Sequence, residues 1–197
     1  LTQTLQTTPG ALDVLIALAD ITQSTGVPAE NRPAAYIALI TQALTLAPGY
    51  APAIVALAQA ESRAGEPTAA LTRLAAALNH RPGDVIVAVA LADLYQTLAQ
   101  PAAAEAVLGD IRARQPGNVS AALALASLYR QQGQAEEARQ TLTQATAIAP
   151  LSAAPWLALA QLETSAPAIR AAFARAAAAD PADSAAPLAA GQFELTQ

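Results

Sequence analysis

The chain contains no cysteine, no methionine and no lysine, and all ten of its basic residues are arginine. The lack of cysteine leaves the redox compartment open. Aromatic residues make up only 4% of the chain and charged residues only 13%, whereas 54% of the residues are hydrophobic, mainly alanine and leucine. So few large side chains argue against a compact enzyme-like domain. Alanine instead favours helices that pack closely against one another.

Basic side chains and long apolar runs are also scarce. The formal net charge is −5, which disfavours nucleic acid and anionic membrane surfaces because both attract concentrated positive charge. No uninterrupted apolar run approaches the ~18 residues of a membrane-spanning helix. We therefore predict no nucleic-acid partner and no membrane contact by this segment.

Proline marks a regular period in the chain. Pro48, Pro82, Pro116 and Pro150 are evenly spaced and define a 34-residue period. The interval from Pro150 to Pro181 is shorter and the interval from Pro9 to Pro48 is longer, which indicates one three-residue deletion and one five-residue insertion. Each period has room for two short helices and two turns. Such internal periodicity is typical of repeat proteins.

The run VIVAVALA at residues 85–92 is ambiguous, because its β-branched side chains also suit a strand. The corresponding stretch one period later contains SAALALA at 120–126, which is rich in alanine and leucine and has high helix propensity. One structural position cannot be a strand in one repeat and a helix in the next. We therefore predict helices for both runs.

Side chains recur in register with the period. The expected first helices carry the pairs Leu18-Ala19, Leu57-Ala58, Leu91-Ala92, Leu125-Ala126 and Leu159-Ala160. The expected second helices carry small and large residues in turn, as in Ala70–Leu74–Ala77 and Ala138–Leu142–Ala145. With these residues the chain resembles the tetratricopeptide repeat (TPR) family. The resemblance implies an all-α, right-handed solenoid of helix–turn–helix hairpins, with about five full repeats and partial repeats at both ends.

The resemblance divides the chain into seven intervals. They are 1–9 (the end of a preceding repeat), 10–48 (a repeat with an insertion), 49–82, 83–116, 117–150, 151–181 (a shortened repeat) and 182–197 (the first helix of a further repeat). Both ends look cut, so we expect a segment of a longer repeat protein. The insertion at residues 26–33 is the expected hinge.

Turn residues agree with this division. The expected N-caps are Asp84, Asn118, Ser152 and Asp183. Gly65 and Gly133 stand where the chain must reverse with positive φ. Pro33, Pro67, Pro101 and Pro167 fall where second helices should begin.

First helices line the concave surface in the family that the chain resembles, and this surface usually binds a peptide. Mapping those positions predicts an apolar row: Ile16, Val55, Val89, Leu123, Leu157 and Leu188. A polar row follows four residues later in each helix: Asp20, Gln59, Asp93, Ser127, Gln161 and Gln192. Arg63 and Arg130 are expected near the rim. Packing of the apolar row against its own neighbours, without a ligand, is the alternative.

Residues that perform catalysis are scarce. His80 is the only histidine, and its place near the end of a second helix is explained by the helix dipole. Trp156, Tyr95 and Tyr129 occupy core positions of the family. The chain has no Cys/His ligand spacing, no glycine-rich phosphate loop and no G-x-S-x-G. We predict no enzyme activity, no cofactor and no metal site.

Three functions fit this description. The first is a non-catalytic scaffold whose concave groove binds a protein or peptide. The second is narrower: low charge, no lysine and abundant Ala, Gln and Thr resemble the periplasmic TPR regions of exopolysaccharide secretion proteins, such as the outer-membrane subunit of bacterial cellulose synthase. Its partners would then include other subunits of a polysaccharide synthase complex. The third is a regulatory or substrate-docking arm of a multidomain enzyme, or a cytoplasmic adaptor.

Overall fold

The described part of the chain is helical throughout. The computed structural model describes residues 11–24, 32–182 and 184–195, and it contains no strand within these ranges. The helices are α2 (Ala11–Ser24), α3 (Arg32–Leu46), α4 (Ala51–Arg63), α5 (Pro67–His80), α6 (Val85–Thr97), α7 (Pro101–Arg114), α8 (Val119–Gln131), α9 (Ala135–Ile148), α10 (Ala153–Ala160), α11 (Ala166–Ala179) and α12 (Ala185–Leu195). The predicted all-α repeat fold is confirmed, and residues 85–92 lie in α6, as their comparison with the next repeat indicated.

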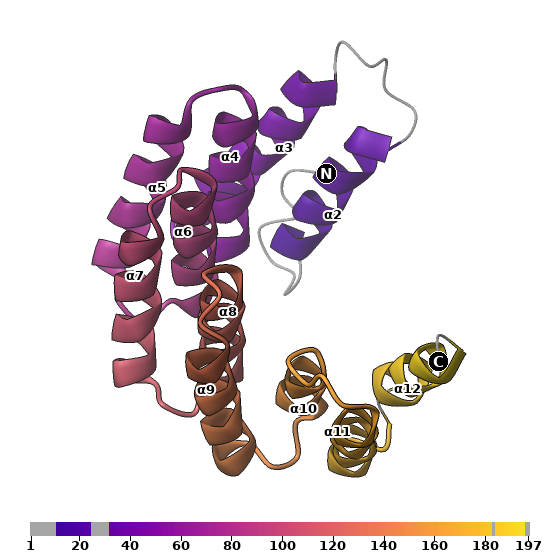
Figure 1. Cartoon of the computed structure of the whole chain (residues 1–197). Coiled ribbons are helices and arrows are strands. Elements are labelled where there is room, and N and C mark those ends of the chain that lie inside the picture. Colours follow the sequence, from indigo (N-terminus) through magenta and orange to yellow (C-terminus); the bar gives the residue numbers. More distant parts are fainter. Residues whose placement is uncertain (1–10, 25–31, 183, 196–197) are drawn as a thin grey trace. The chain divides into compact units, whose positions relative to one another are not determined.

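The helices belong to two compact units, Leu1–Leu98 with α2 to α6 and Ala99–Gln197 with α7 to α12. Within the first unit α2 packs on α3 and α4 packs on α5; within the second, α8 packs on α9 and α10 on α11 (Figure 1). Each unit thus contains two helical pairs, with α6 added to the first unit and α7 and α12 to the second. The expected preceding repeat at 1–9 and most of the expected hinge at 26–33 lie outside the described residues.

Alanine lets successive helices approach closely. Ala19, Ala58, Ala92, Ala126 and Ala160 follow the repeated leucine, and none of them is more than 4% exposed. The leucines themselves differ, because Leu91 and Leu125 are 3% exposed whereas Leu18 is 45% exposed. No described helix precedes α2, and the face of α2 that carries Leu18 therefore remains open among the described residues.

Helix starts follow the predicted caps only in part. The Asp84 carboxylate accepts a hydrogen bond from the Val87 N–H at 3.3 Å, and the Asn118 side chain accepts one from the Ala121 N–H at 3.0 Å. Ser152 takes the predicted N-cap position of α10, but its side chain forms no capping bond. Asp183 lies outside the described residues. Capping thus secures α6 and α8 but not α10.

Proline begins two of the predicted second helices. Pro67 and Pro101 are the first residues of α5 and α7, while Pro33 and Pro167 are each the second residue of their helix. A proline here loses nothing, because the first N–H groups of a helix have no partner within it.

The turns between paired helices use the left-handed region of backbone space. Gly65 and Gly133 have φ of 86° and 76°, which confirms the prediction. Ala99 lies one repeat period from each of them and has φ of 55°. The repeat therefore imposes the same turn on a residue whose side chain disfavours it.

Candidate functional site

The predicted groove residues lie on first helices in both units, except Gln161, which directly follows α10. The apolar residues Ile16, Val55, Val89, Leu123 and Leu157 are half-buried, and the polar residues Asp20, Gln59, Asp93 and Gln161 are exposed, with Ser127 half-buried. Ile16 packs against the core of the first unit, and Leu157 packs against the core between α10, α11 and α12. Part of the apolar row is therefore used in packing within each unit.

A pocket of about 290 Å³ in the first unit brings two of the polar row together. Gln59 from α4 and Asp93 from α6 line this pocket, and Leu74 from α5 forms part of its floor. Ser62 and Arg63 complete the polar lining on the side of α4. We call this hollow the first pocket. Gln59 and Asp93 are one repeat period apart, and the repeat places them on neighbouring first helices.

A pocket of about 150 Å³ in the second unit collects three further predicted residues. Leu123 and Ser127 come from α8, and Gln161 follows the end of α10. Arg130 lines the same hollow, and Leu142 from α9 forms part of its floor. We call this hollow the second pocket. Ile16, Asp20, Val55, Val89 and Leu157 line neither of these two pockets.

The two pockets are equivalent by sequence. Seven lining residues of the first pocket have a counterpart that lines the second pocket two repeat periods later in the chain. The pairs are Ala58/Ala126, Gln59/Ser127, Ser62/Arg130, Leu74/Leu142, Ala90/Ala158, Asp93/Gln161 and Leu94/Leu162. The apolar members of the set are unchanged and the polar members all differ. A common scaffold therefore carries two different polar linings.

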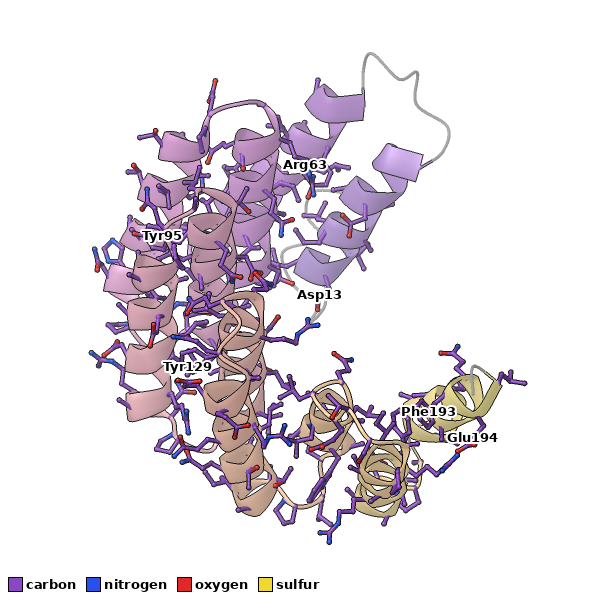
Figure 2. All side chains as sticks on the ribbon, viewed as in Figure 1. Asp13, Arg63, Tyr95, Tyr129, Phe193 and Glu194 are labelled. Carbon is purple, nitrogen blue, oxygen red and sulfur yellow. The ribbon has the colours of Figure 1, made fainter. Side chains whose placement is uncertain are left out.

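Charge in the first pocket is mixed. Desolvation raises the pKa of Asp93 above the usual range of an aspartate. Arg63, which Figure 2 labels on α4, acts on Tyr36 of the adjacent helix α3. Burial and the negative charge of Asp20 raise the pKa of the Tyr36 hydroxyl, while the charge and hydrogen bonding of Arg63 oppose that rise. Three helices therefore contribute to one polar cluster beside the pocket.

Tyr36 is a site residue that the sequence analysis missed. It lies one repeat period before Ala70, the small residue at the start of the second-helix pattern, and it is only 5% exposed. The departure from a small residue at this position was a visible signal. The contact with Arg63 was not visible, because it joins α3 to α4 across the fold.

Polar contacts between successive hairpins recur in the second unit. Tyr129 donates to Glu105 at 3.0 Å, Arg139 to Glu163 at 2.6 Å and Arg170 to Glu194 at 2.6 Å, and the spacing along the chain is the same in each pair. Figure 2 shows Glu194 on α12, beside Phe193, whose ring meets Phe173 edge-on at 6.2 Å. These contacts link a second helix to the hairpin that follows it, and none of the six residues lines the second pocket.

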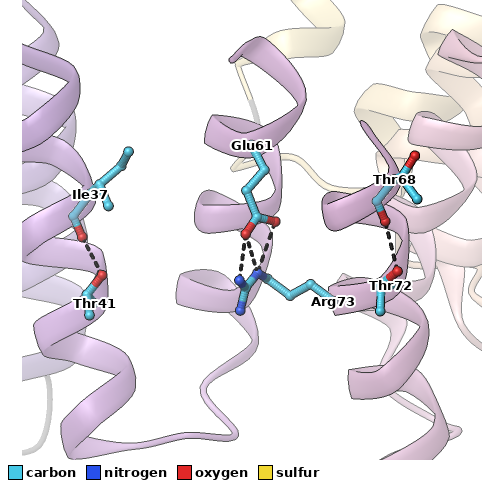
Figure 3. Close-up of polar contacts among 6 residues, drawn as sticks. All are labelled: Ile37, Thr41, Glu61, Thr68, Thr72 and Arg73. Atoms are coloured by element: carbon cyan, nitrogen blue, oxygen red, sulfur yellow. Dashed lines mark hydrogen bonds and ion pairs between the residues drawn. The ribbon is translucent and has the colours of Figure 1, made fainter. Parts of the chain in front are cut away.

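The corresponding contact in the first unit lies within one hairpin. Arg73 of α5 donates through Nε to both carboxylate oxygens of Glu61 on α4, at 3.1 Å, and through Nη2 to Oε1 at 2.5 Å (Figure 3). The Thr41 and Thr72 hydroxyls in the same view donate to carbonyls of their own helices, at 2.7 and 2.8 Å.

Several residues considered for other roles line neither the first nor the second pocket. His80 is the exposed last residue of α5. Trp156 is half-buried, and the Arg175 guanidinium lies 5.1 Å from the centre of its ring. Residues 11–24, 32–182 and 184–195 contain no group of three or more His, Cys, Asp or Glu side chains that could hold a metal ion. None of the described helices is long and apolar enough to cross a membrane.

Comparison with known proteins defines the family. A tetratricopeptide repeat family model matches residues 62–116 and 98–162, which together span half of the chain. The chain therefore belongs to the tetratricopeptide repeat family. No match was found among curated proteins.

Solved structures share the fold. The TPR protein TTC0263 of Thermus thermophilus is 21% identical with a TM-score of 0.66, and the match covers 93% of this chain and 99% of that one. A TPR protein of Parabacteroides merdae ATCC 43184 is 17% identical with a TM-score of 0.56, over 87% of this chain and 68% of that one. YrrB, described as a TPR protein with an unusual peptide-binding site, is 18% identical with a TM-score of 0.50, over 89% of each chain.

Proposed function

We propose that the chain is a non-catalytic scaffold that binds a segment of a partner protein through the inner faces of its first helices. The observation that carries this proposal is the gathering of predicted groove residues in two equivalent pockets. Gln59 and Asp93 line the first, and Leu123, Ser127 and Gln161 line the second. Hollows with an apolar floor and a few polar groups are typical ligand sites.

Two further facts support the proposal. The family to which the chain belongs is built for docking, because stacked helical hairpins present extended surfaces to partners. One structural neighbour, YrrB, is described as having a peptide-binding site. A partner segment with apolar anchors would place side chains in the pockets, since pocket-filling anchors supply most of the binding energy of such interfaces.

The test is a selection of short peptides from a randomised displayed library on the whole chain, followed by blocking of each pocket. Gln59→Trp and Ser127→Trp place a bulky side chain at the first and second pocket, respectively. Each substitution is expected to lower the affinity of the chain for peptides that use that pocket by about tenfold or more, as the loss of an interface anchor does.

Matched controls use exposed positions on second helices. Thr68→Trp on α5 and Thr143→Trp on α9 are expected to leave the affinity unchanged. Circular dichroism checks that every variant remains helical. Failure to select any peptide, or equal affinities for pocket and control variants, would contradict the proposal.

A narrower proposal concerns the setting of this scaffold. We infer that the chain is a periplasmic segment of a larger bacterial envelope protein for exopolysaccharide export, such as cellulose export, with synthase subunits as partners. It is supported by the low charged fraction of 13% and by the absence of lysine. Cell fractionation and co-purification of the tagged parent protein test it. Recovery with the cytoplasm would instead favour the regulatory arm of an enzyme or a cytoplasmic adaptor.

A further inference from the structure

The second pocket contains one charged side chain. Arg130 lines it together with Ser127 and Gln161, and the remaining lining is alanine and leucine. No carboxylate contributes to this pocket, whereas Asp93 lines the first one. The second pocket is therefore the more positive of the two equivalent sites.

Arg130 differs from the other arginines of its unit. Arg112 contacts Thr141, Arg114 pairs with Asp110, Arg139 with Glu163, Arg170 with Glu194, and Arg175 stacks on Trp156. The guanidinium of Arg130 has no such hydrogen bond, ion pair or ring contact within the described residues. Its donors remain available to a ligand.

Position on the helix explains why an unpaired cation is tolerated there. Arg130 lies in the last turn of α8, where the helix dipole favours positive charge. The dipole does not account for a hydroxyl and an amide that line the same hollow. The Ser127 hydroxyl and the Gln161 amide can each donate and accept hydrogen bonds. They surround an apolar floor that includes Leu142, which is 1% exposed.

The size of the hollow sets the size of the group that it accepts. A cavity near 150 Å³ accommodates a benzene-sized group, and the second pocket has about this volume. A side chain with a short apolar stem and a carboxylate could pack its stem against the apolar floor and pair its carboxylate with the Arg130 guanidinium. Arginine binds a carboxylate with two parallel N–H donors, which favours this partner over a neutral amide of the same shape.

We propose that the second pocket binds an acidic side chain, Glu or Asp, of the partner segment, with Arg130 as the residue that determines this specificity. The inference rests on the proposed scaffold function and adds the chemistry of one contact. The local charge of the pocket favours this occupant, because Arg130 lines it and no carboxylate does.

Three pools of short fluorescent peptides test this on the whole chain. All have acetylated and amidated ends, which removes terminal charges, and all contain a fixed leucine with neighbouring positions randomised. The pools differ at one further fixed position, which is Glu, Gln or phosphoserine. Fluorescence anisotropy should show the Glu pool binding about tenfold more tightly than the Gln pool, the difference expected of a charge-assisted contact.

Arg130→Gln should remove the preference for Glu over Gln, and Arg130→Lys should retain part of it, because charge remains without the planar fork. Arg114→Gln is the matched control, since Arg114 is an exposed arginine of the same unit outside the pocket. Circular dichroism and the thermal midpoint confirm that each variant is folded. Backbone and side-chain amide signals of Gln161 should shift in NMR spectra on addition of a peptide from the Glu pool.

Equal binding of the Glu and Gln pools by the wild-type chain would overturn this inference. So would the same Glu preference in Arg130→Gln and Arg114→Gln, or tighter binding of the phosphoserine pool than of the Glu pool. In all three cases the scaffold function stands if Ser127→Trp still weakens binding. Loss of the scaffold function would instead appear as no difference between the pocket-blocking and control tryptophan variants.

Discussion

Glu61 in the first unit and Glu163 in the second stand three repeat periods apart, at the same place in their hairpins. Glu61 pairs forward with Arg73 of its own hairpin, whereas Glu163 pairs back with Arg139 of the preceding hairpin. Ile37 takes the place of Arg139 in the first unit. On α11 the place of Arg73 is taken by Ala172, because the shortened repeat lacks three residues before this helix. The comparison shows that the repeat fixes where a side chain lies, while the local sequence decides what it binds.

The two pockets follow the same rule. Alanine and leucine keep their identity over two repeat periods and form equivalent floors, while Ser62 becomes Arg130 and Asp93 becomes Gln161. Packing tolerates little change in the volume of a floor side chain. A polar residue at the rim is free to vary, because it faces water or a ligand. Recognition can therefore diverge between repeats without any change of fold.

The largest expected effect concerns the pocket floors. Leu74→Ala and Leu142→Ala each remove a leucine that is 2% or 1% exposed. Each should lower the free energy of unfolding by about 3 kcal/mol, because a cavity is left behind. Urea denaturation measures the loss, and hydrogen exchange resolved by helix should place it in the unit that carries the change. A loss below about 1 kcal/mol at either site would show that the floors are not equivalent.

Substitutions in the turns should change the free energy of unfolding by a smaller amount, and in opposite directions at the equivalent residues Gly133 and Ala99. Gly133→Ala should destabilise the chain by about 1 kcal/mol, because φ is 76° there and a left-handed residue with a Cβ is strained. Ala99→Gly, at φ of 55°, should stabilise it by about the same amount. Thermal and urea unfolding measure both. Destabilisation by Ala99→Gly would contradict the view that the repeat imposes this turn.

A contact within the first unit, between Tyr50 and Asp13, is expected to respond to pH. Tyr50 takes the N-cap position that Asp84 and Asn118 occupy later, and its hydroxyl donates to Asp13 instead. Burial, the hydrogen bond to Asp13 and the charge of Asp13 raise the pKa of Tyr50 to about 12, above the ~10 of an exposed tyrosine.

The hydrogen bond requires the neutral phenol, so its stabilisation is fully present below pH ~10 and is lost as the pH rises through about 12. Tyr50→Phe should therefore lower the free energy of unfolding by about 1 kcal/mol at neutral pH. The difference from the wild type should shrink across the alkaline window when unfolding is followed against pH. A difference that stays constant there would exclude a role for the phenolic proton.

The smallest expected effect is the coupling energy of the two ion pairs, Glu61 with Arg73 and Glu163 with Arg139. Double-mutant cycles with Gln in place of Glu61 and Arg73, and of Glu163 and Arg139, should each give a coupling of about 0.5 kcal/mol, since the pairs are partly exposed. Added salt should weaken both couplings. A cycle between Glu163→Gln and Arg73→Gln serves as the control and should give no coupling.

The architecture could be predicted from the sequence because equivalent positions can be compared from one repeat to the next. Pro48 to Pro150 gave the period, the recurring alanines marked close helix contacts, and Gly65 and Gly133 marked turns. The same spacing pointed to Ala99, although its side chain gave no local sign of a left-handed turn. Local chemistry was less informative at Ser152, where a good capping residue forms no capping bond.

The pockets were predictable only as rows of residues. Spacing placed Gln59, Asp93, Ser127 and Gln161 on one face, and Arg63 and Arg130 near its rim. It did not show that Tyr36 would engage Arg63 while Arg130 has no side-chain partner among the residues that the structure describes, because such contacts depend on three-dimensional neighbours. Nor did it distinguish the half-buried Val55 and Val89 from the residues that line pockets.

The most direct test transfers the polar lining of one pocket to the other. In a chain that carries Arg130→Gln and has lost its preference for the Glu pool, Gln59→Ser, Ser62→Arg and Asp93→Gln together give the first pocket the serine, arginine and glutamine of the second, beside its own Arg63. Binding of the Glu and Gln pools is then compared by fluorescence anisotropy. Our account predicts that the Glu preference returns. A folded variant that binds both pools equally would contradict it.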